Sequence, residues 1–298
     1  QAQFSNSFVP PTEISPFRTQ TNKEVSKNIF NEINPENIHG VELLAGKLTL
    51  QNNYQSIIDI SENDDVSIKF FGGYKFDIEM AEKLAKLGVS RLSVSIDSMD
   101  SQVHDEFRGK KGALKKALDA LEHANTAGMA AYMNITVGHY NSFSDDLEKM
   151  MQYSKDNGYT TLVNVACPSG AWKDNDNIMC DEKDTAHLIQ LRKKYKNTFR
   201  NLWNAMDRDY EQVLGCNTVN RLYVTPIGDV LVCPYVHIKI GNLYEQSLKE
   251  ISDYGFRIKR FRNYSSKCLA GEDKEFIKRF MTKNGQTIFK PAWQNTCD

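Results

Sequence analysis

The spacing of apolar positions along the chain alternates between two periods. Short apolar runs rich in β-branched residues are followed by longer stretches whose apolar positions recur at helical spacing. This alternation indicates repeated strand–helix units and a parallel sheet, so we predict an α/β fold with six such units. The strands are expected at residues 3–4, 40–44, 66–71, 91–96, 132–137 and 161–166, and the helices begin near residues 21, 54, 78, 114, 145 and 185.

The pattern changes after residue 195. Residues 196–215 are expected to form a connector, and residues 221–225 and 230–232 a hairpin around a Pro-Ile-Gly-Asp turn. Two further helices are expected near residues 247–260 and 272–281. We therefore predict a strand–helix body over residues 1–210 and a small C-terminal domain over residues 211–298.

Composition narrows the classes of partner. Of the 298 residues 40% are hydrophobic, which is enough for a full core, and 37 basic against 38 acidic residues give a net charge of −1. Such a balance does not steer a protein onto nucleic acid or an anionic membrane, so we expect a small-molecule or peptide substrate, or a partner enzyme. The sequence shows no signal-peptide pattern and no apolar run of about 18 to 20 residues, which favours a cytoplasmic location.

All six cysteines lie between Cys167 and Cys297. In a reducing compartment, cysteines more often serve as core residues, metal ligands or catalytic groups than as disulfides. The C-terminal cysteines have no C-x2-C spacing, so spacing by itself leaves metal binding and simple burial open as alternatives.

Two regions of the sequence resemble a known family. GVSRLSVSIDSMDSQVHDEFRG at residues 88–109 closely resembles the fourth-strand region of radical SAM enzymes. GDVLVCPY (228–235), GNLYEQSLKEI (241–251) and CLAGED (268–273) resemble the SPASM or twitch extension, which holds an auxiliary iron–sulfur cluster. The resemblance implies a partial (β/α)6 parallel barrel of radical SAM type, with its chemistry at the carboxyl ends of the strands, and a small C-terminal SPASM/twitch-like domain.

The resemblance also draws attention to the loop after the first strand. In the family this loop carries a C-x3-C-x2-C motif, whose [4Fe-4S] cluster binds and reductively cleaves S-adenosylmethionine. Laid on this sequence, the motif falls on Phe8, Thr12 and Ser15. A phenyl ring and two neutral hydroxyls cannot replace soft thiolate ligands. The SAM-cleaving cluster is therefore expected to be absent.

Other positions that bind the nucleotide in the family are partly kept. The glycine-rich segment after the second strand retains Gly46, but Lys47 places a cation where the family has an acid, and this cation would repel the methionyl ammonium. Ser95 and Arg108 match positions that contact the carboxylate end of the nucleotide, and Asp97 lies at the tip of the same strand. The resemblance thus implies S-adenosylmethionine binding residues at Gly46, Ser95, Asp97 and Arg108, with weakened affinity.

The C-terminal cysteines are the candidate metal ligands. Four thiolates can saturate a [4Fe-4S] cube, and the resemblance around Cys233 and Cys268 implies an auxiliary cluster held by Cys216, Cys233, Cys268 and Cys297. Cys167 and Cys180 flank the loop after the sixth strand and offer a further ligand, but burial in the core is the favoured interpretation for both.

Polar residues on the later strands form a second group of candidates. Alternation places Asn134 and Thr136 on one face of their strand, and Asn164 lies among apolar neighbours on the next. These side chains are expected either to bind polar substrate groups or to be satisfied core residues. Weaker candidates are Lys47, His139, Tyr235 and the basic run Arg257, Lys259, Arg260 and Arg262, for which a loop position or a solvated helix end is favoured.

Two functional hypotheses follow. The leading one is a radical SAM-fold protein that has lost its SAM-cleaving cluster, retains an auxiliary [4Fe-4S] cluster and serves as a binding or partner subunit. The second is an enzyme, either an altered but active radical SAM enzyme that modifies a carbohydrate or peptide, or a barrel with non-radical chemistry. The iron content per chain discriminates between them.

Overall fold

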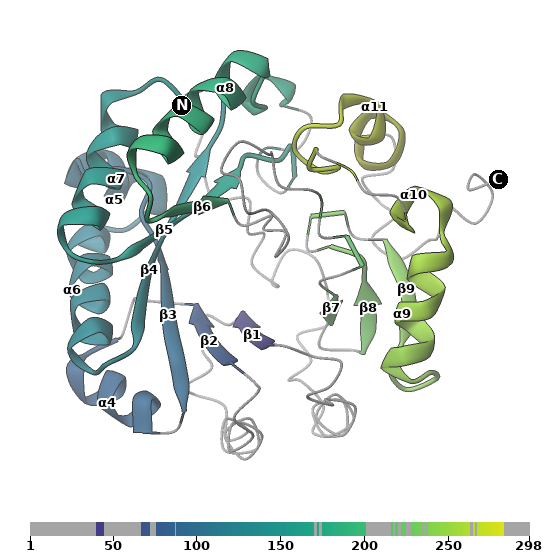
Figure 1. Ribbon diagram of the computed structural model, residues 1–298, viewed down its shortest axis with the longest axis horizontal. Helices are drawn as coiled ribbons and strands as arrows, with labels where there is room; N and C mark the ends of the chain where they lie inside the picture. Colours follow the sequence, from purple (N-terminus) through teal and green to yellow (C-terminus); the bar gives the residue numbers. More distant parts are fainter. Residues whose placement is uncertain are drawn as a thin grey trace. The chain divides into compact units, whose positions relative to one another are not determined.

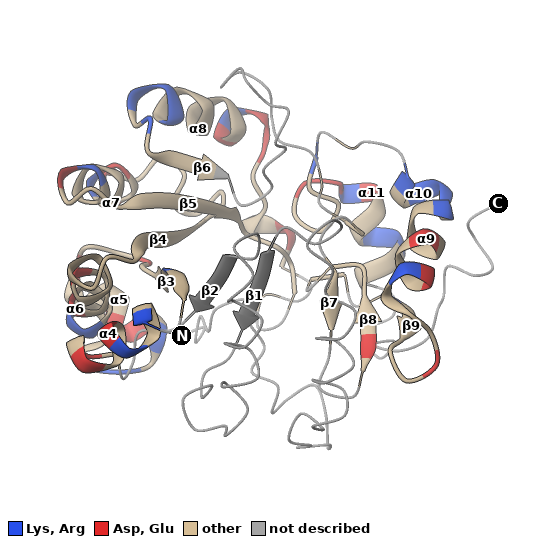
Figure 2. Ribbon diagram, turned by 60° about the horizontal axis from the view of Figure 1, so that its bottom comes forward, with Lys and Arg blue, Asp and Glu red and all other residues tan. Residues whose placement is uncertain are grey.

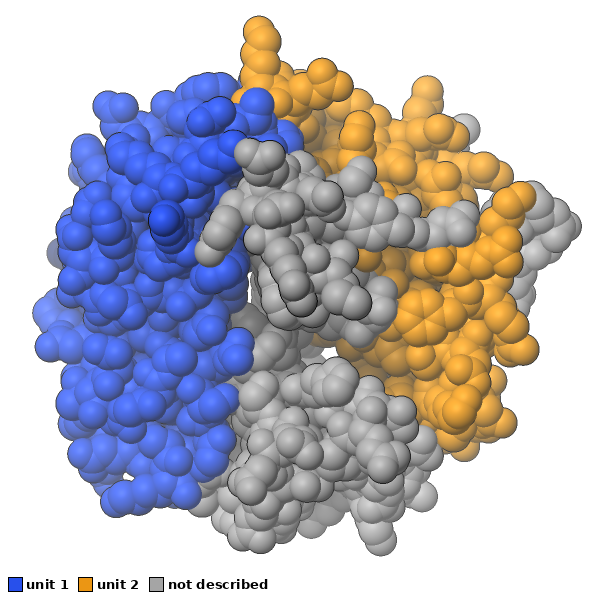
Figure 3. All heavy atoms as spheres, viewed as in Figure 1, with its two compact units in different colours: residues 1–4, 33–164, 184–201 blue, residues 5–32, 165–183, 202–298 orange. Residues whose placement is uncertain are grey.

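The computed structural model divides the chain into two compact units, whose helices and strands are labelled in Figure 1. Figure 3 colours the described residues of the two units, blue for those within residues 33–164 and 184–201 and orange for those within residues 165–183 and 202–298. The residues described here are 40–44, 67–71, 76–86, 88–169, 172, 175–200, 216, 218–219, 222–224, 228–233, 235–236, 238–262, 265 and 267–282.

A six-stranded sheet is the framework of the first unit. Its spatial order β1-β2-β3-β4-β5-β6 is also the order along the sequence, and the registered pairs β1·β2, β2·β3, β3·β4 and β5·β6 are parallel. The carboxyl ends of these strands therefore lie along one edge. The strands are β1 Gly40–Leu44, β2 Ser67–Phe71, β3 Val89–Ser95, β4 Ala130–Val137, β5 Thr160–Val165 and β6 Thr198–Arg200.

The helices of this unit cover one side of the sheet (Figure 1). Their first turns carry recognisable caps: Asp100 accepts hydrogen bonds from the N–H groups of Gln102 and Val103, and Ser144 accepts one from Leu147. The helices are α4 Ile78–Lys86, α5 Ser101–Arg108, α6 Ala113–Thr126, α7 Asp145–Asp156 and α8 Glu182–Lys194.

The two faces of the sheet have different side chains. Leu92 on β3 and Met133 and Ile135 on β4 are fully buried beneath the helices. Tyr132 and Thr136, at the alternate positions of β4, are half-buried. The period-2 pattern of these strands therefore separates an apolar helix-facing side from a polar side, as the sequence predicted.

The second unit contains a three-stranded antiparallel sheet in the order β7-β8-β9. A capping box starts α9, because Ser247 Oγ accepts from Glu250 N–H while the Glu250 carboxylate accepts from Ser247 N–H. The elements are β7 Tyr223–Val224, β8 Asp229–Leu231, β9 Lys239–Asn242, α9 Leu248–Arg257, α10 Lys259–Arg262, α11 Lys274–Ile277, the π-helical turn η4 Lys278–Thr282 and, in the loop after β5, the 3₁₀ turn η3 Asp176–Ile178.

The α/β fold class and the hairpin β7–β8 are confirmed, and three local predictions need correction. The expected connector 196–215 contains β6, which is too short to show a period but pairs with β5 through a fully buried Thr198. The third strand, β9, was not predicted. The expected helix 247–260 is interrupted at Ile258, whose backbone is extended.

Three of the predicted elements, the strand at residues 3–4 and the helices beginning near residues 21 and 54, lie outside the described residues. Among the helices that are described, none combines the length and the apolar character needed to cross a bilayer.

Candidate functional site

Thiols from three places in the second unit form the candidate metal centre. Cys216 precedes a turn that includes Val219, whose φ of 70° is unusual for a β-branched residue. Cys233 lies two residues after the end of β8, and Cys268 immediately precedes the turn before α11. The three residues lie close enough for charge on Cys268 to act on Cys216 and Cys233. The structure thus brings together three of the four predicted ligands, and Cys297 lies outside the described residues.

Cys167 belongs to the same group. It lies two residues beyond the end of β5 and is 1% exposed. Its thiol is in hydrogen-bonding contact with Cys268 and interacts electrostatically with Cys233. A second contact, to the carbonyl of Val165, is 3.5 Å long. The sequence favoured a core role for Cys167, whereas the structure places it among the candidate ligands.

Backbone amides surround the sulfur atoms. Tyr235 N–H donates to Cys233 Sγ at 3.5 Å, and the amides of Val236 and Leu269 interact with Cys233 and Cys216. Such donors stabilise a thiolate and influence the reduction potential of a bound cluster.

Without a metal, the thiols of Cys167, Cys216 and Cys233 are neutral at pH 7. Contact with the Cys268 thiol and burial raise the pKa of Cys167 well above its usual value. Burial raises the pKa of Cys216, and it raises the pKa of Cys233 to about 12. Metal uptake must therefore release protons here, and four soft sulfur donors in a buried site suit an iron–sulfur cluster.

The end of β3 holds the predicted nucleotide residues. Arg108, at the end of α5, donates through Nε to the Asp97 carboxylate, which is 8% exposed. Asp97 N–H donates to His104 Nδ1 at 3.1 Å, and burial raises the pKa of Asp97 while the Arg108 charge opposes that rise. Asp97 and Arg108 are thus brought together as an internal ion pair, and Ser95 is half-buried two residues before Asp97. Gly46 and Lys47 lie outside the described residues.

Polar side chains line the side of the sheet opposite the helices. Asn134 Nδ2 donates to Ser93 Oγ at 2.5 Å, and both residues are buried. Asn134 Oδ1 is buried without a hydrogen-bond partner. Thr136 and Asn164 are half-buried at corresponding alternate positions of β4 and β5. The predicted polar face therefore exists, and its half-buried positions are Thr136 and Asn164.

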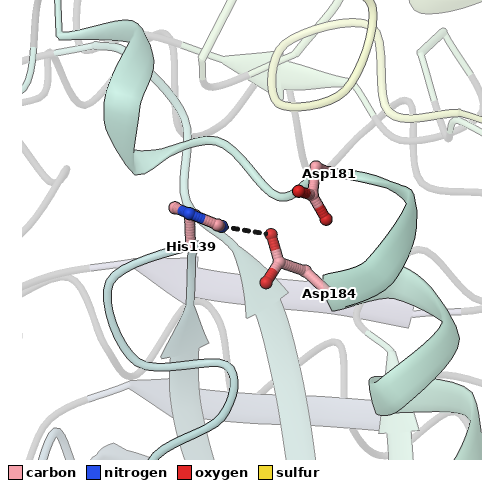
Figure 4. Close-up of side chains that lie close together, drawn as sticks. All are labelled: His139, Asp181 and Asp184. Carbon is pink, nitrogen blue, oxygen red and sulfur yellow. Dashed lines mark hydrogen bonds and ion pairs between the residues drawn. The ribbon is translucent and has the colours of Figure 1, made fainter.

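His139 lies in the loop after β4, as predicted, but it is tied to a residue that the sequence analysis missed. Its Nδ1 is 2.8 Å from Asp184 Oδ2 (Figure 4), and Ser142 Oγ donates to the other carboxylate oxygen. Asp184 is 0% exposed, whereas the His139 side chain is 57% exposed. Asp181, drawn in the same figure, accepts a hydrogen bond from Lys183 N–H at 2.7 Å.

The basic run is a surface feature. Lys and Arg residues colour α10 blue in Figure 2, and Lys259, Arg260 and Arg262 are exposed. Arg260 forms an ion pair with Asp273 at 3.0 Å. This arrangement agrees with the predicted solvated helix end.

Family comparisons agree with this geometry. The Radical SAM superfamily profile matches residues 22–153, and the profile of the iron–sulfur cluster-binding domain SPASM matches residues 216–272. The chain belongs to the radical SAM superfamily. The radical SAM match begins after Phe8, Thr12 and Ser15, and the SPASM match contains Cys216, Cys233 and Cys268.

Individual relatives of this radical SAM protein are distant. The chain is 28% identical over 197 residues to the AdoMet-dependent heme synthase of Methanosarcina barkeri, covering 58% of this chain and 56% of that protein. It is 26% identical over 250 residues to the mycofactocin maturase MftC of Mycolicibacterium smegmatis, covering 78% and 60%. The chain therefore spans little more than half the length of these curated relatives.

Solved structures support the fold. A structure described as native anSMEcpe with bound AdoMet and Kp18Cys peptide matches with a TM-score of 0.58 and 13% identity, over 91% of this chain and 90% of the other. At this identity the likeness shows the radical SAM fold alone.

Proposed function

We propose that this chain is an iron–sulfur protein that holds an auxiliary [4Fe-4S] cluster in its SPASM domain and binds a peptide or a partner enzyme, without cleaving S-adenosylmethionine itself. The observation that carries the proposal is the group of neighbouring, buried or half-buried thiols in the second unit. Cys216, Cys233 and Cys268 come from separate segments. If these thiols served only to fill the core, there would be no reason for three of them to meet around backbone N–H donors.

The role of the auxiliary cluster follows from this chain's own residues. Once bound, such a cluster supplies electron transfer, or an anchor for the surrounding backbone. The amides near Cys216 and Cys233 stabilise negative charge on sulfur, and burial of Cys167 and Cys268 limits the access of water. Both effects favour a stable cluster over one that exchanges iron readily.

The proposed loss of SAM cleavage rests on the first loop and on β3. Phe8, Thr12 and Ser15 offer no thiolate, and no cysteine of the printed sequence precedes Cys167. At the end of β3, Arg108 is paired with buried Asp97, so an incoming carboxylate must compete with an existing ion pair. We therefore expect weak binding of S-adenosylmethionine.

A peptide or protein ligand is the favoured binding partner. The polar side of the sheet carries the half-buried side chains of Thr136 and Asn164. A peptide backbone supplies N–H and C=O groups that can pair with a hydroxyl and an amide of this kind. The maturase name of one relative and the peptide in one solved structure of this fold motivate this choice of class.

Iron analysis tests the proposal. After anaerobic reconstitution, the chain is expected to hold about four irons and about four sulfides, as one [4Fe-4S] cluster requires. Calorimetry with S-adenosylmethionine is expected to show weak binding, and reduction with dithionite should yield no 5′-deoxyadenosine.

The opposite outcomes are distinct. About eight irons, with tight nucleotide binding and 5′-deoxyadenosine formation, would support the second hypothesis, an active enzyme that modifies a carbohydrate or peptide. The similarity to a maturase and to an AdoMet-bound structure is the observation that favours this second hypothesis. A chain without iron after reconstitution would overturn the cluster itself.

A further inference from the structure

We propose that Cys167, from the segment after β5, is the fourth thiolate ligand of the auxiliary cluster, beside Cys216, Cys233 and Cys268. This inference rests on the proposed function, and it replaces Cys297 in the ligand set predicted from sequence. It assigns part of the metal centre to a segment far from the SPASM match in the sequence.

The chain partition supports this assignment. Residues 165–183 belong to the same compact unit as residues 202–298, although they lie between β5 and α8. Cys167 is therefore part of the C-terminal unit in space. The SPASM match ends at residue 272 and includes three cysteines, so the matched residues leave one position of a four-ligand cube unfilled.

The contact between the two segments is very close at Gly271. A Cβ atom at this position would lie 3.0 Å from Val165 Cγ2, 3.1 Å from the Ala166 carbonyl oxygen and 3.1 Å from Cys167 Sγ. A side chain at this position would be tighter against these atoms than ordinary contacts allow, so the turn or the Cys167 segment would have to shift by a few tenths of an ångström.

The turn that contains Gly271 also fixes Cys268. The Cys268 carbonyl accepts hydrogen bonds from Gly271, Glu272 and Asp273, and Cys268 N–H donates to Glu272 Oε2 at 2.7 Å. A rigid turn thus holds Cys268 next to Cys167, whose thiol it contacts. The buried Cys167 thiol therefore lies next to another sulfur atom, that of Cys268, and not only among apolar carbon atoms.

The test compares four single variants in the full-length protein. Cys167→Ala is matched with Cys180→Ala, which removes another buried thiol from the same segment, and with Cys297→Ala and Cys233→Ala. Each variant is reconstituted anaerobically, and iron, sulfide, the visible absorption of the cluster and the EPR spectrum of the reduced cluster are measured.

We expect Cys167→Ala to lose at least about one of four irons, and its remaining cluster to change its EPR spectrum when an exogenous thiol is added, because one iron is open to solvent. Cys180→Ala and Cys297→Ala should match the parent, and Cys233→Ala should lose the cluster. If Cys167→Ala reduces folding, as judged by circular dichroism, Cys167→Ser provides the test: an oxygen ligand of similar size should alter the EPR g-values.

Failure of this inference differs from failure of the proposed function. If the parent holds a cluster and Cys167→Ala and Cys167→Ser keep parental iron content and spectra, the inference is wrong while the auxiliary cluster stands. An open iron in Cys297→Ala, detected by the exogenous thiol, also overturns it. If the parent itself binds no iron, both proposals fail together.

Discussion

At the scale of single residues, two buried cysteines show how position in space separates side chains that sequence treats alike. Cys167 and Cys180 flank the same loop, and both are buried. Cys167 contacts the Cys268 thiol and lies beside the Gly271 turn. Apolar burial predicts an inert thiol, whereas proximity to other sulfur atoms predicts a ligand.

His104 provides a residue-scale prediction about pH. Burial lowers its pKa to about 4, with the Arg108 charge acting in the same direction, and its Nδ1 accepts a hydrogen bond from Asp97 N–H. The unfolded chain therefore takes up this proton first as the pH falls. We expect stability to decrease between about pH 6.5 and about pH 4, by up to about 3 kcal/mol from this residue.

Urea unfolding at about pH 7 and about pH 4.5 measures this effect. His104→Asn keeps an acceptor at the δ position and cannot titrate, so its stability should change less over this range than that of the parent. His123→Asn, in which a half-exposed histidine is replaced, serves as the control. Equal pH dependence in the parent and His104→Asn would contradict the assignment.

At the scale of elements, the second unit depends on close approach of a helix to a strand. A Cβ atom at Gly241, on β9, would lie 2.6 Å from Ile251 Cγ1 on α9. Ile251 is 0% exposed, so it has no room to move aside. The glycine sets the distance between strand and helix, which no local propensity of either element reveals.

We therefore expect Gly241→Ala to destabilise the second unit by about 1 to 3 kcal/mol through overpacking. The matched control is Glu245→Ala in the exposed turn between β9 and α9, which should leave stability within about 0.5 kcal/mol of the parent. Chemical denaturation followed by circular dichroism measures both variants. A neutral Gly241→Ala would show that α9 can shift away from β9.

At the scale of the whole molecule, a single boundary in the sequence does not separate the two compact units. Sequence predicted a boundary near residue 210, whereas the segment 165–183 groups with the C-terminal residues. If the cluster ties this segment to the SPASM domain, removal of a ligand should loosen both parts of the second unit. We expect the sheet of the first unit to stay folded, because its strands contain no cysteine.

Limited proteolysis tests this prediction. Cys268→Ala should gain cleavage sites within residues 165–183 as well as beyond residue 202, while the strands β3 and β4 remain protected. Mass spectrometry locates the new sites, and Cys180→Ala serves as the control. New cleavage sites confined to residues beyond 210 would favour the boundary expected from sequence. If Cys268→Ala resists protease as well as the parent and binds the same amount of iron, the thiols are packing residues.

Sequence by itself determined the repeating elements and the family. The period of the apolar positions gave the strands β3, β4 and β5 and the helices α6 and α7 within a few residues, because a buried face imposes its spacing on the chain. Local motifs around Cys233 and Cys268 were also sufficient to indicate the SPASM extension, since such motifs are contiguous. The same patterns could not reveal β6, which is three residues long and exists through its pairing with β5.

Tertiary structure alone decided which distant residues meet. It paired Asp97 with Arg108, tied His139 to Asp184, and brought Cys167 to Cys268, about a hundred positions away. These contacts depend on how strands, turns and loops fold back on one another, and such long-range closure leaves no period in the sequence. Gly271 is the clearest example. The Cys167 segment packs closely against it and favours a residue without a side chain, and the residues next to Gly271 in the sequence do not reveal this contact.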